Sequence, residues 1–573
     1  MGSTPQKEPW QSIAARKQAQ RESKIPSEWR IPQTLLPPPE ASVVQDFPHT
    51  SGFFTGRELT ITESTASDVV AKIAAQEWSA EEVTKAICKR AAVAQQLLNC
   101  VTEIYFEEAI GRARELDVYQ KQHDGKTVGP LHGLPISFKD QFNLPGVDST
   151  IGYISYADKP ATTPSTLVQL LTSAGAIPYV KSNVPATLMM GESVNNVFGR
   201  TLNPRNRSLT TGGSSGGESA LVTFRASFLG VGTDIGGSIR HPASYTGLFA
   251  LRPSHGRVSY QQAVNTYLGQ EAVRSCAGPL CRSPADISLF MRSLAAQEPW
   301  LSDPQALPIP WRTELEILPA QLCFGFGMGD GHVTPTPPLR RAMEITKAKL
   351  EAAGHKVIDF TPHEMPEASE IITEMWSADN GQGFQRDTDA SGEPLHPQLE
   401  RWLGHSAAEA QLKTGEKPQS VFDTWQNQHR RALLAQRWLE RWQATAKETG
   451  TGRPIDGLIM PSTPFPAIRH DGGYPWHWGA MSPLLDLATG VFPVTKVDLE
   501  KDKVPADWQP ISAKDKEVME YLNNSLTSIL HADGRPENHS NALIGLALIA
   551  RRLEEEKVTA MLEVMKDVVG IDY

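Results

Sequence analysis

Residues 210–242 constrain the fold of this chain more than any other stretch, because they place two clusters of glycine and serine on either side of an apolar segment. The first cluster is GGSSGG at residues 212–217 and the second is GGS at residues 236–238, with a helix-like piece at residues 220–228 between them. Glycine permits close backbone approach and positive φ angles that other residues avoid. Two such clusters, each with a serine, predict a site where backbone N–H groups meet a reacting oxygen atom.

Three other interpretations of this stretch explain it less well. A flexible linker would lack the apolar flanks that both clusters have here. A phosphate-binding loop would need a lysine where Glu218 stands, and a carboxylate repels phosphate. Residues 212–216 also match G-x-S-x-G, the nucleophile elbow of α/β-hydrolases, but that pattern leaves residues 236–238 without a role.

A third segment, GLPISFKD at residues 133–140, decides between these interpretations. Together with residues 210–242 it resembles the signature of the amidase signature family of serine hydrolases. Within that family the chain is similar to the fungal acetamidase type of general amidase. The resemblance covers nearly the whole chain from about Leu59, and further matching fragments are residues 130–135, 179–185, 201–205, 251–257, 297–300, 390–394 and 459–462.

Helices and short apolar strands alternate along the chain, which predicts an α/β protein with a central sheet covered by helices. The resemblance implies a central mixed β-sheet with helices on both faces, in a single domain over residues 56–573, and a cap-like helical insertion at roughly residues 375–453. The predicted strands are residues 134–138, 176–181, 229–231, 356–360, 455–461 and 490–495, and the apolar segment at residues 543–549 closes the chain together with a helix at residues 554–568.

Residues 1–55 are rich in proline, glutamine and charged residues. We expect a short helix at residues 10–22 and an extended segment around residues 32–39, where proline fixes φ and removes backbone donors. Two interpretations stay open for this N-terminal extension. It is either an arm packed on the main domain, which could also contribute to a homodimer contact, or a partly disordered tail.

Composition limits the partners and the location of this 573-residue chain. A net charge of −10 without a basic segment argues against binding to nucleic acid or to an acidic membrane. No apolar run approaches the roughly 20 residues that span a bilayer, and the N-terminus lacks the basic-then-apolar order of a signal peptide. Five cysteines without a C-x-x-C pair indicate reduced thiols. We therefore expect a cytoplasmic protein whose partner is a small-molecule amide.

The resemblance implies a Ser-cisSer-Lys triad that needs no metal or other cofactor. Ser238 attacks the amide carbonyl, and Ser214, which follows a cis peptide bond, bridges Ser238 to Lys139. Neutral Lys139 accepts the proton and later returns it to the leaving nitrogen. A free lysine has a pKa of about 10.4, so burial must lower the pKa of Lys139 to roughly 7–8 before it can act as a base.

The resemblance also implies roles for the residues around the triad. The oxyanion hole is expected beside Ser214, and its donors are the backbone N–H groups of Ile235, Gly236, Gly237 and Ser238. Four residues are expected to position these groups: Ser215, Thr233, Asp234 and Arg240. Arg240 is expected to hold the loops or to pair with Asp234, although an arginine can also recognise a substrate carboxylate.

Other polar residues near the motifs are interpreted as structural. The mechanism has no use for Lys181, His132 or His241 as acid or base groups. Asp140 either orients Lys139 or caps the turn that follows it. Leu188 to Phe198 is expected beside the acyl pocket because the corresponding segment lies there in the family.

The C-terminal part departs from the pattern of acetamidase-like chains. Leu543 and Ala547 stand where those chains usually carry proline and glutamine, so a polar anchor of the substrate pocket is missing. Acetamide-like small amides are the expected substrates. The alternatives are a larger secondary-metabolite amide, an amidotransferase-type subunit that works with a partner, and an inactive scaffold, which the intact Lys139, Ser214 and Ser238 disfavour.

Overall fold

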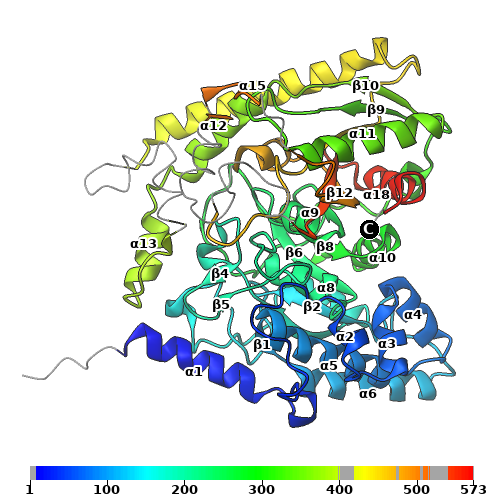
Figure 1. Cartoon of the computed structure of the whole chain (residues 1–573), viewed down its shortest axis with the longest axis vertical. Helices are drawn as coiled ribbons and strands as arrows, with labels where there is room; N and C mark the ends of the chain where they lie inside the picture. Colours follow the sequence, from blue (N-terminus) through cyan, green and yellow to red (C-terminus); the bar gives the residue numbers. More distant parts are fainter. Residues whose placement is uncertain are drawn as a thin grey trace, which may run out of the picture.

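The computed structural model describes residues 8–397, 399, 418–472, 476–503, 508–513, 515–516 and 540–571 of the chain. Its central element is an eleven-stranded sheet with the strand order β1-β3-β2-β6-β8-β7-β12-β13-β11-β9-β10 (Figure 1). The strands of this sheet are β1 (Val101–Ile104), β2 (Pro135–Lys139), β3 (Ile177–Ser182), β6 (Leu229–Asp234), β7 (Phe249–Arg252), β8 (Cys276–Cys281), β9 (Cys323–Phe326), β10 (Lys356–Asp359), β11 (Gly457–Pro461), β12 (Thr489–Lys496) and β13 (Leu543–Ile549). A separate two-stranded sheet is formed by β4 (Val194–Asn195) and β5 (Gly199–Arg200).

The large sheet is mixed. β2 lies parallel to both β3 and β6, and β9 lies parallel to both β10 and β11. The strands between these two groups, and β1 at the edge, pair in antiparallel fashion. Parallel neighbours require a crossover connection, usually through a helix. The predicted α/β class with a central mixed sheet is confirmed.

Helices surround the sheet. They are α1 (Trp10–Ser23), α2 (Phe47–Thr50), α3 (Gly56–Glu63), α4 (Ala66–Ala74), α5 (Ala80–Leu98), α6 (Phe106–Gln122), α7 (Thr166–Ser173), α8 (Gly216–Thr223), α9 (Arg240–Thr246), α10 (Pro284–Ala295), α11 (Pro337–Ala352), α12 (Met365–Trp376), α13 (Gln382–Asp389), α15 (Val421–Ala444), α16 (Met481–Leu484) and α18 (Glu555–Val564).

Strand β12 shows that helices cover both faces of the sheet. Successive side chains of a strand point to opposite faces. Gly490 of β12 lies against Leu562 of α18, whereas the next residue, Val491, packs in a buried cluster with Ala243 of α9. Helices α9 and α18 therefore lie on opposite faces, as the resemblance implied.

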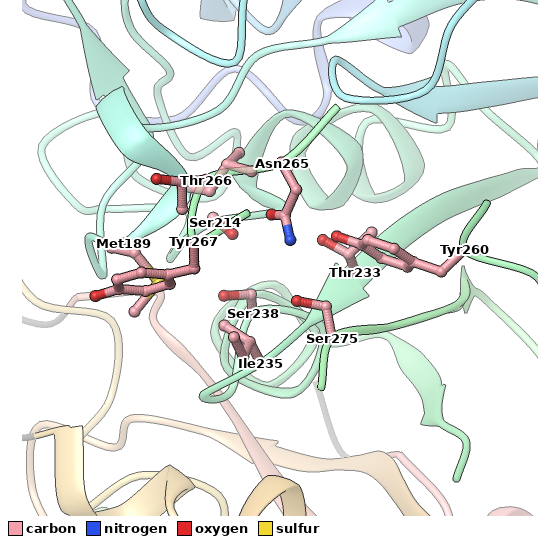
Figure 2. Close-up of a pocket in the computed structure, with 11 residues that line it drawn as sticks. Met189, Ser214, Thr233, Ile235, Ser238, Tyr260, Asn265, Thr266, Tyr267 and Ser275 are labelled. Atoms are coloured by element: carbon pink, nitrogen blue, oxygen red, sulfur yellow. The ribbon is translucent and has the colours of Figure 1, made fainter. Parts of the chain in front are cut away.

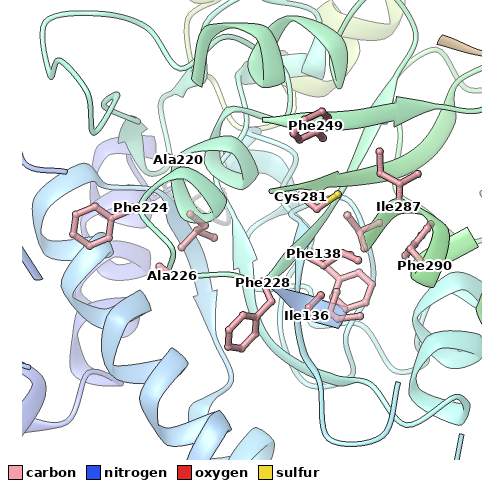
Figure 3. Close-up of a cluster of buried hydrophobic side chains, with 14 of the residues drawn as sticks. Ile136, Phe138, Ala220, Phe224, Ala226, Phe228, Phe249, Cys281, Ile287 and Phe290 are labelled. Carbon is pink, nitrogen blue, oxygen red and sulfur yellow. The ribbon is translucent and has the colours of Figure 1, made fainter. Parts of the chain in front are cut away.

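The largest hydrophobic core packs against β2 and holds that strand in place. Figure 3 shows Ile136 and Phe138 of β2 beside Phe290 of α10, with further aromatic side chains from the α8 region nearby. Ile136, Phe138 and Phe290 have no exposed surface. Full burial of such a side chain stabilises a fold by roughly 1.5–3 kcal/mol. Since β2 ends at Lys139, this packing fixes the position of the lysine backbone.

The N-terminal segment is held against the body of the protein by α1 (dark blue in Figure 1). Lys17 Nζ forms ion pairs with Glu103 at 2.7 Å and with Asp148 at 2.8 Å. The three side chains are 7%, 7% and 3% exposed, respectively, so these charges are largely removed from water. Arg21 of α1 also donates a hydrogen bond to the carbonyl of Val101 in β1. Residues 1–7 lie outside the described residues.

The predicted cap segment, residues 375–453, contains α13 and α15, while residues 398 and 400–417 lie outside the described residues. Helix α15 is tied to α12 by the ion pairs Arg430–Glu374 at 2.8 Å and Arg441–Glu364 at 2.7 Å. The last residue of α12, Trp376, is 2% exposed and lies against the second glycine cluster.

Within the described ranges, no helix is both long enough and apolar enough to cross a membrane. All five cysteines are buried and carry free thiols, in agreement with the expected reduced state.

Candidate active site

The predicted site residues come together where two neighbouring parallel strands end. Lys139 is the last residue of β2, and Asp234 is the last residue of β6. Because β2 and β6 are parallel neighbours, their carboxyl ends lie at the same edge of the sheet. Ser214 precedes α8, and Ser238 lies between β6 and α9, so both glycine-serine clusters form loops at helix starts beside this edge.

Lys139 is fully buried and is held by two hydroxyl groups. Its Nζ donates to Ser214 Oγ at 2.7 Å and to Thr233 Oγ1 at 2.7 Å. The side chain has no exposed surface, and desolvation lowers the pKa of Lys139 from 10.5 to about 7. Burial disfavours the charged form of an amine. A substantial fraction of Lys139 is therefore neutral, and able to accept a proton, at neutral pH.

A buried carboxyl group lies close to the lysine. Glu218 of α8 accepts a hydrogen bond from Ser137 Oγ at 2.5 Å, and Ser137 precedes Lys139 by two residues on β2. Burial raises the pKa of Glu218 to about 7, and the Glu218 charge in turn favours the protonated form of Lys139. The two groups titrate in the same pH range.

The first glycine-serine loop has the expected backbone geometry. The peptide bond between Gly213 and Ser214 is cis. A Cβ atom on Gly213 would lie 2.4 Å from the carbonyl oxygen of Met190, so only glycine fits there. The neighbouring Ser215 binds both backbone groups of Thr233: its hydroxyl donates to the carbonyl and accepts from the N–H, each at 3.2 Å. Ser215 thus positions the loop against β6, as expected.

The two serine loops are joined through their backbones. The N–H of Ser215 donates to the carbonyl of Ser238 at 3.2 Å. Ser214 and Ser238 both line one pocket, but no hydrogen bond joins their hydroxyl groups in the structure. Catalytic hydrogen bonds are often long before substrate binds. The three predicted triad residues therefore lie together in the structure. Of the two hydrogen bonds expected among them, the one between Lys139 and Ser214 is present.

Asp234 and Arg240 fix the backbone of the second glycine-serine loop, residues 236–238. Arg240 forms a two-pronged ion pair with Asp234, both distances being 3.0 Å, and it also donates to the carbonyl of Gly479. Burial alone would raise the pKa of Asp234, but the Arg240 guanidinium holds it well below its usual range. Asp234 also accepts hydrogen bonds from the backbone N–H groups of Gly237 and Ile239. These contacts favour the structural role of Arg240 over recognition of a substrate carboxylate.

Gly237 differs from the expectation. Its N–H donates to Asp234 Oδ1 at 2.9 Å, so it is not free to bind an oxyanion. In the part of the chain that the structure describes, the N–H groups of Ile235, Gly236 and Ser238 have no hydrogen-bond acceptor and are the candidate donors. Gly237 is needed for its shape instead, because it has a φ of +127° and a Cβ atom there would lie 2.0 Å from His241. The sequence motif could not show which of the four N–H groups Asp234 occupies.

The pocket beside the serines is small. Its empty space, part of which is open to solvent, is about 250 Å³ (Figure 2). It is lined by Leu188, Met189, Ser214, Thr233, Ile235, Ser238, Tyr260, Asn265, Thr266, Tyr267 and Ser275. The segment from Leu188 to Phe198 was expected beside the acyl pocket, and its first two residues, Leu188 and Met189, line this pocket.

Sequence reasoning missed the wall formed by residues 260–275. Five lining residues belong to the connection between β7 and β8, namely Tyr260, Asn265, Thr266, Tyr267 and Ser275. Strands β7 and β8 were not predicted either. The segment carries no motif with a recognisable spacing. Its contribution depends on how β7 and β8 pair with each other.

One of the two C-terminal replacements shares a buried apolar cluster with a pocket residue. Ala547 of β13 is 4% exposed and belongs to the same buried apolar cluster as Met189 and Trp376. Gly236 contacts Trp376 so closely that a Cβ atom would lie 2.7 Å from the indole ring. The apolar cluster that contains Ala547 thus reaches the pocket through Met189 and the second glycine cluster through Trp376.

The remaining candidates are structural. Asp140 accepts hydrogen bonds from Thr102, Thr150 and the N–H of Ile151. Among the described residues it binds neither Lys139 nor an N–H of the turn that directly follows it, so neither of its two predicted roles is seen. Lys181 pairs with Asp140 at 3.7 Å and donates to Ser149, away from the serines of the pocket.

Neither predicted structural histidine acts as an acid or base here. His132 Nδ1 accepts from the N–H of Val128. Burial, followed by the charge of Arg240, lowers the pKa of His241 to about 3. Within the described ranges, no group of three or more His, Cys, Asp or Glu side chains is arranged to hold a metal ion.

Comparisons with known proteins agree with this geometry. The family model described as Amidase matches residues 82–559. The Curvularia clavata protein kk1C, whose name describes it as an amidase, is 66% identical over 98% of this chain and 99% of its own length. The acetamidase of Emericella nidulans is 41% identical over 98% of both chains. A solved structure of fatty acid amide hydrolase superposes with a TM-score of 0.88 at 31% identity, covering 99% of this chain and 96% of its own.

Proposed function

Because the chain belongs to the amidase family and is an amidase, we propose that it hydrolyses a small carboxylic acid amide through an acyl-enzyme on Ser238. The observation that carries this proposal is the buried Lys139, whose pKa is about 7 and whose Nζ binds Ser214 in the pocket that Ser238 also lines.

The first half of the reaction forms the acyl-enzyme. Ser238 Oγ attacks the amide carbon while its proton passes through Ser214 Oγ to neutral Lys139. The negative charge that develops on the carbonyl oxygen is stabilised by the N–H groups of Ile235, Gly236 and Ser238. One donor of this kind contributes about 3 kcal/mol to transition-state stabilisation. The C–N bond then breaks, and the leaving nitrogen takes a proton from Lys139 through Ser214.

The second half of the reaction releases the acid. Water enters after the ammonia or amine has left, and it attacks the ester carbon of the acyl-enzyme. The Lys139–Ser214 pair accepts the proton of the water and returns it to Ser238 Oγ. Lys139 begins and ends neutral, so the cycle needs no external acid or base.

Two observations favour a small substrate. The pocket space of about 250 Å³ leaves little room for a long acyl chain. The Emericella nidulans relative, 41% identical over 98% of this chain, is named an acetamidase. We therefore propose acetamide-like amides as the substrate class and ammonia as the usual leaving group.

Labelling with a fluorophosphonate tests this function. The reagent modifies activated serines, and mass spectrometry of the digested protein identifies the modified residue. We expect modification of Ser238, none in Ser238→Ala, and slower labelling at the same residue in Ser214→Ala. Modification of Ser214 would instead indicate a nucleophile elbow, and an unlabelled wild-type protein that hydrolyses no amide would refute the proposal.

The purified chain should hydrolyse acetamide without a partner protein, which separates this function from an amidotransferase subunit. We further propose a cytoplasmic location, because five buried free thiols suit a reducing compartment. The homodimer stays a prediction that size-exclusion chromatography with light scattering tests.

A further inference from the structure

The pocket has two chemically different sides. In Figure 2, Met189 and the ring of Tyr267 lie on one side, while Thr233, Tyr260, Asn265 and Ser275 lie on the other. Of these four polar residues, only Thr233 belongs to the catalytic motifs. The other three come from the connection between β7 and β8, outside every segment that the chemistry of amide hydrolysis requires.

Three of the four polar residues are already occupied by a hydrogen-bond chain that begins at the catalytic lysine. Thr233 Oγ1 accepts from Lys139 and donates to Gln141 Oε1 at 2.6 Å. The amide nitrogen of Gln141 donates to Tyr260 Oη, at 2.5 Å. Tyr260 in turn shares a side-chain hydrogen bond with Ser275. The chain thus holds the polar side of the pocket rigidly against Lys139.

Asn265 stands apart from this chain. Its amide points into the space between Ser214 and Tyr260 in Figure 2. Among the described residues, its side chain has no hydrogen-bond partner, although it is partly buried. An asparagine amide offers donors and an acceptor. Leaving such a group unpaired beside an apolar substrate is unfavourable, whereas a polar substituent on the substrate would satisfy it.

We propose that Asn265 determines specificity by binding a hydrogen-bonding substituent next to the scissile carbonyl. This inference rests on the proposed amide hydrolysis and names its substrate class. The preferred substrates are small polar amides that carry a hydroxyl, carbonyl or second amide group on the carbon beside the reacting carbonyl. Asn265 binds this substituent, and Met189 and Tyr267 contact the rest of the acyl group.

A pair of substrates of nearly equal size tests the assignment. Glycolamide and propionamide differ by a hydroxyl in place of a methyl group. Their intrinsic reactivities differ, but that difference is the same for every enzyme variant and cancels when ratios are compared. We therefore measure kcat/KM for both amides with wild-type protein and with Asn265→Leu, which keeps the size of the side chain and removes its hydrogen bonds.

The ratio of kcat/KM for glycolamide to that for propionamide should fall roughly tenfold in Asn265→Leu, because a site built for a polar group loses its discrimination when that partner is removed. Asn265→Ala should shift the ratio in the same direction, which keeps the test valid if the leucine variant does not fold. Thr266→Val is the matched control on the same loop. Thr266 is 4% exposed and valine keeps its size and shape, so this change should affect both substrates alike.

The outcomes separate this inference from the proposed function. An unchanged ratio in both Asn265 variants, with amide hydrolysis that is lost in Ser238→Ala, would refute the role of Asn265 and leave the amidase mechanism intact. A ratio that falls equally in Thr266→Val would show a general loosening of the loop and would also refute it. Hydrolysis of neither amide by wild-type protein, together with no labelling of Ser238, would overturn both proposals.

Discussion

Replacing Lys139 with methionine should abolish amide hydrolysis and at the same time stabilise the folded protein. The lysine has no exposed surface, and burial lowers its pKa from 10.5 to about 7. Between these two pH values the unfolded chain binds a proton that the folded protein does not hold. Lys139 therefore reduces the free energy of unfolding, and this reduction shrinks as the pH rises toward 10.5.

The magnitude follows from the two pKa values. Proton linkage gives a destabilisation by Lys139 of about 3 kcal/mol at pH 8 and about 1 kcal/mol at pH 10. The gain from Lys139→Met should therefore be about 2.5 kcal/mol larger at pH 8 than at pH 10. The hydrogen bonds lost to Ser214 and Thr233 and the packing of the methionine do not titrate, so they cancel in this difference. Above pH 8 the lysine is mostly neutral, and the neighbouring Glu218 meets similar surroundings in both proteins.

Urea unfolding followed by tryptophan fluorescence at pH 8 and pH 10 measures this difference. Lys126→Met is the control, because the Lys126 side chain is exposed. Its effect should stay within about 0.5 kcal/mol at both pH values. A stability change in Lys139→Met that does not depend on pH would refute the argument that burial keeps this lysine neutral, and with it the physical basis for its role as a base.

Three further predictions follow from the same contacts. The specificity constant kcat/KM should decrease below a pKa near 7 as Lys139 becomes protonated, and at pH 6 it should be about a tenth of its maximum. Glu218→Gln should move this decrease to lower pH, because the variant lacks a charge that favours the protonated lysine. A flat profile between pH 5.5 and 8 would contradict both expectations. Lys17→Met leaves two buried carboxylates without their partner and should lower the free energy of unfolding by about 3 kcal/mol, whereas Arg16→Met, at an exposed ion pair, should change it by less than about 1 kcal/mol in the same denaturation assay. Gly237→Ala should reduce kcat at least roughly a hundredfold, because the added methyl group collides with the histidine beside it and displaces the oxyanion donors; steady-state kinetics with near-normal kcat would show that the loop can adjust.

Local sequence patterns predicted much of the framework. The strand expected at residues 490–495 lies within β12, and the strand expected at residues 455–461 contains β11. The helix expected at residues 10–22 is α1. These segments are long or strongly apolar, so their periodicity alone indicates an element. Strands β7 and β8 were missed because they are short, and β8 contains glycine and proline, which are uncommon in strands.

The candidate site was predictable where the motif itself determines the contact. The sequence indicated a lysine with a lowered pKa beside Ser214, and the structure contains that hydrogen bond and that shift. It also indicated a pair between Asp234 and Arg240, six residues apart at one strand end, and this pair is present. The need for glycine at position 237 was predicted, but its N–H was wrongly expected to bind the oxyanion. That N–H instead donates to the carboxylate of Asp234, the last residue of β6.

The sequence alone determined the family, and it predicted the reacting groups and the requirement for glycine in the two loops, because a family signature is defined by residue types along the chain. Only the tertiary structure decided which N–H groups are free, that Trp376 of α12 lies against Gly236, and that Asn265 enters the pocket. The last two contacts join segments that are tens to more than a hundred residues apart in the chain, and the first depends on how the loop folds back on Asp234. Their geometry is fixed by how the sheet pairs and how its core packs, which no local pattern encodes.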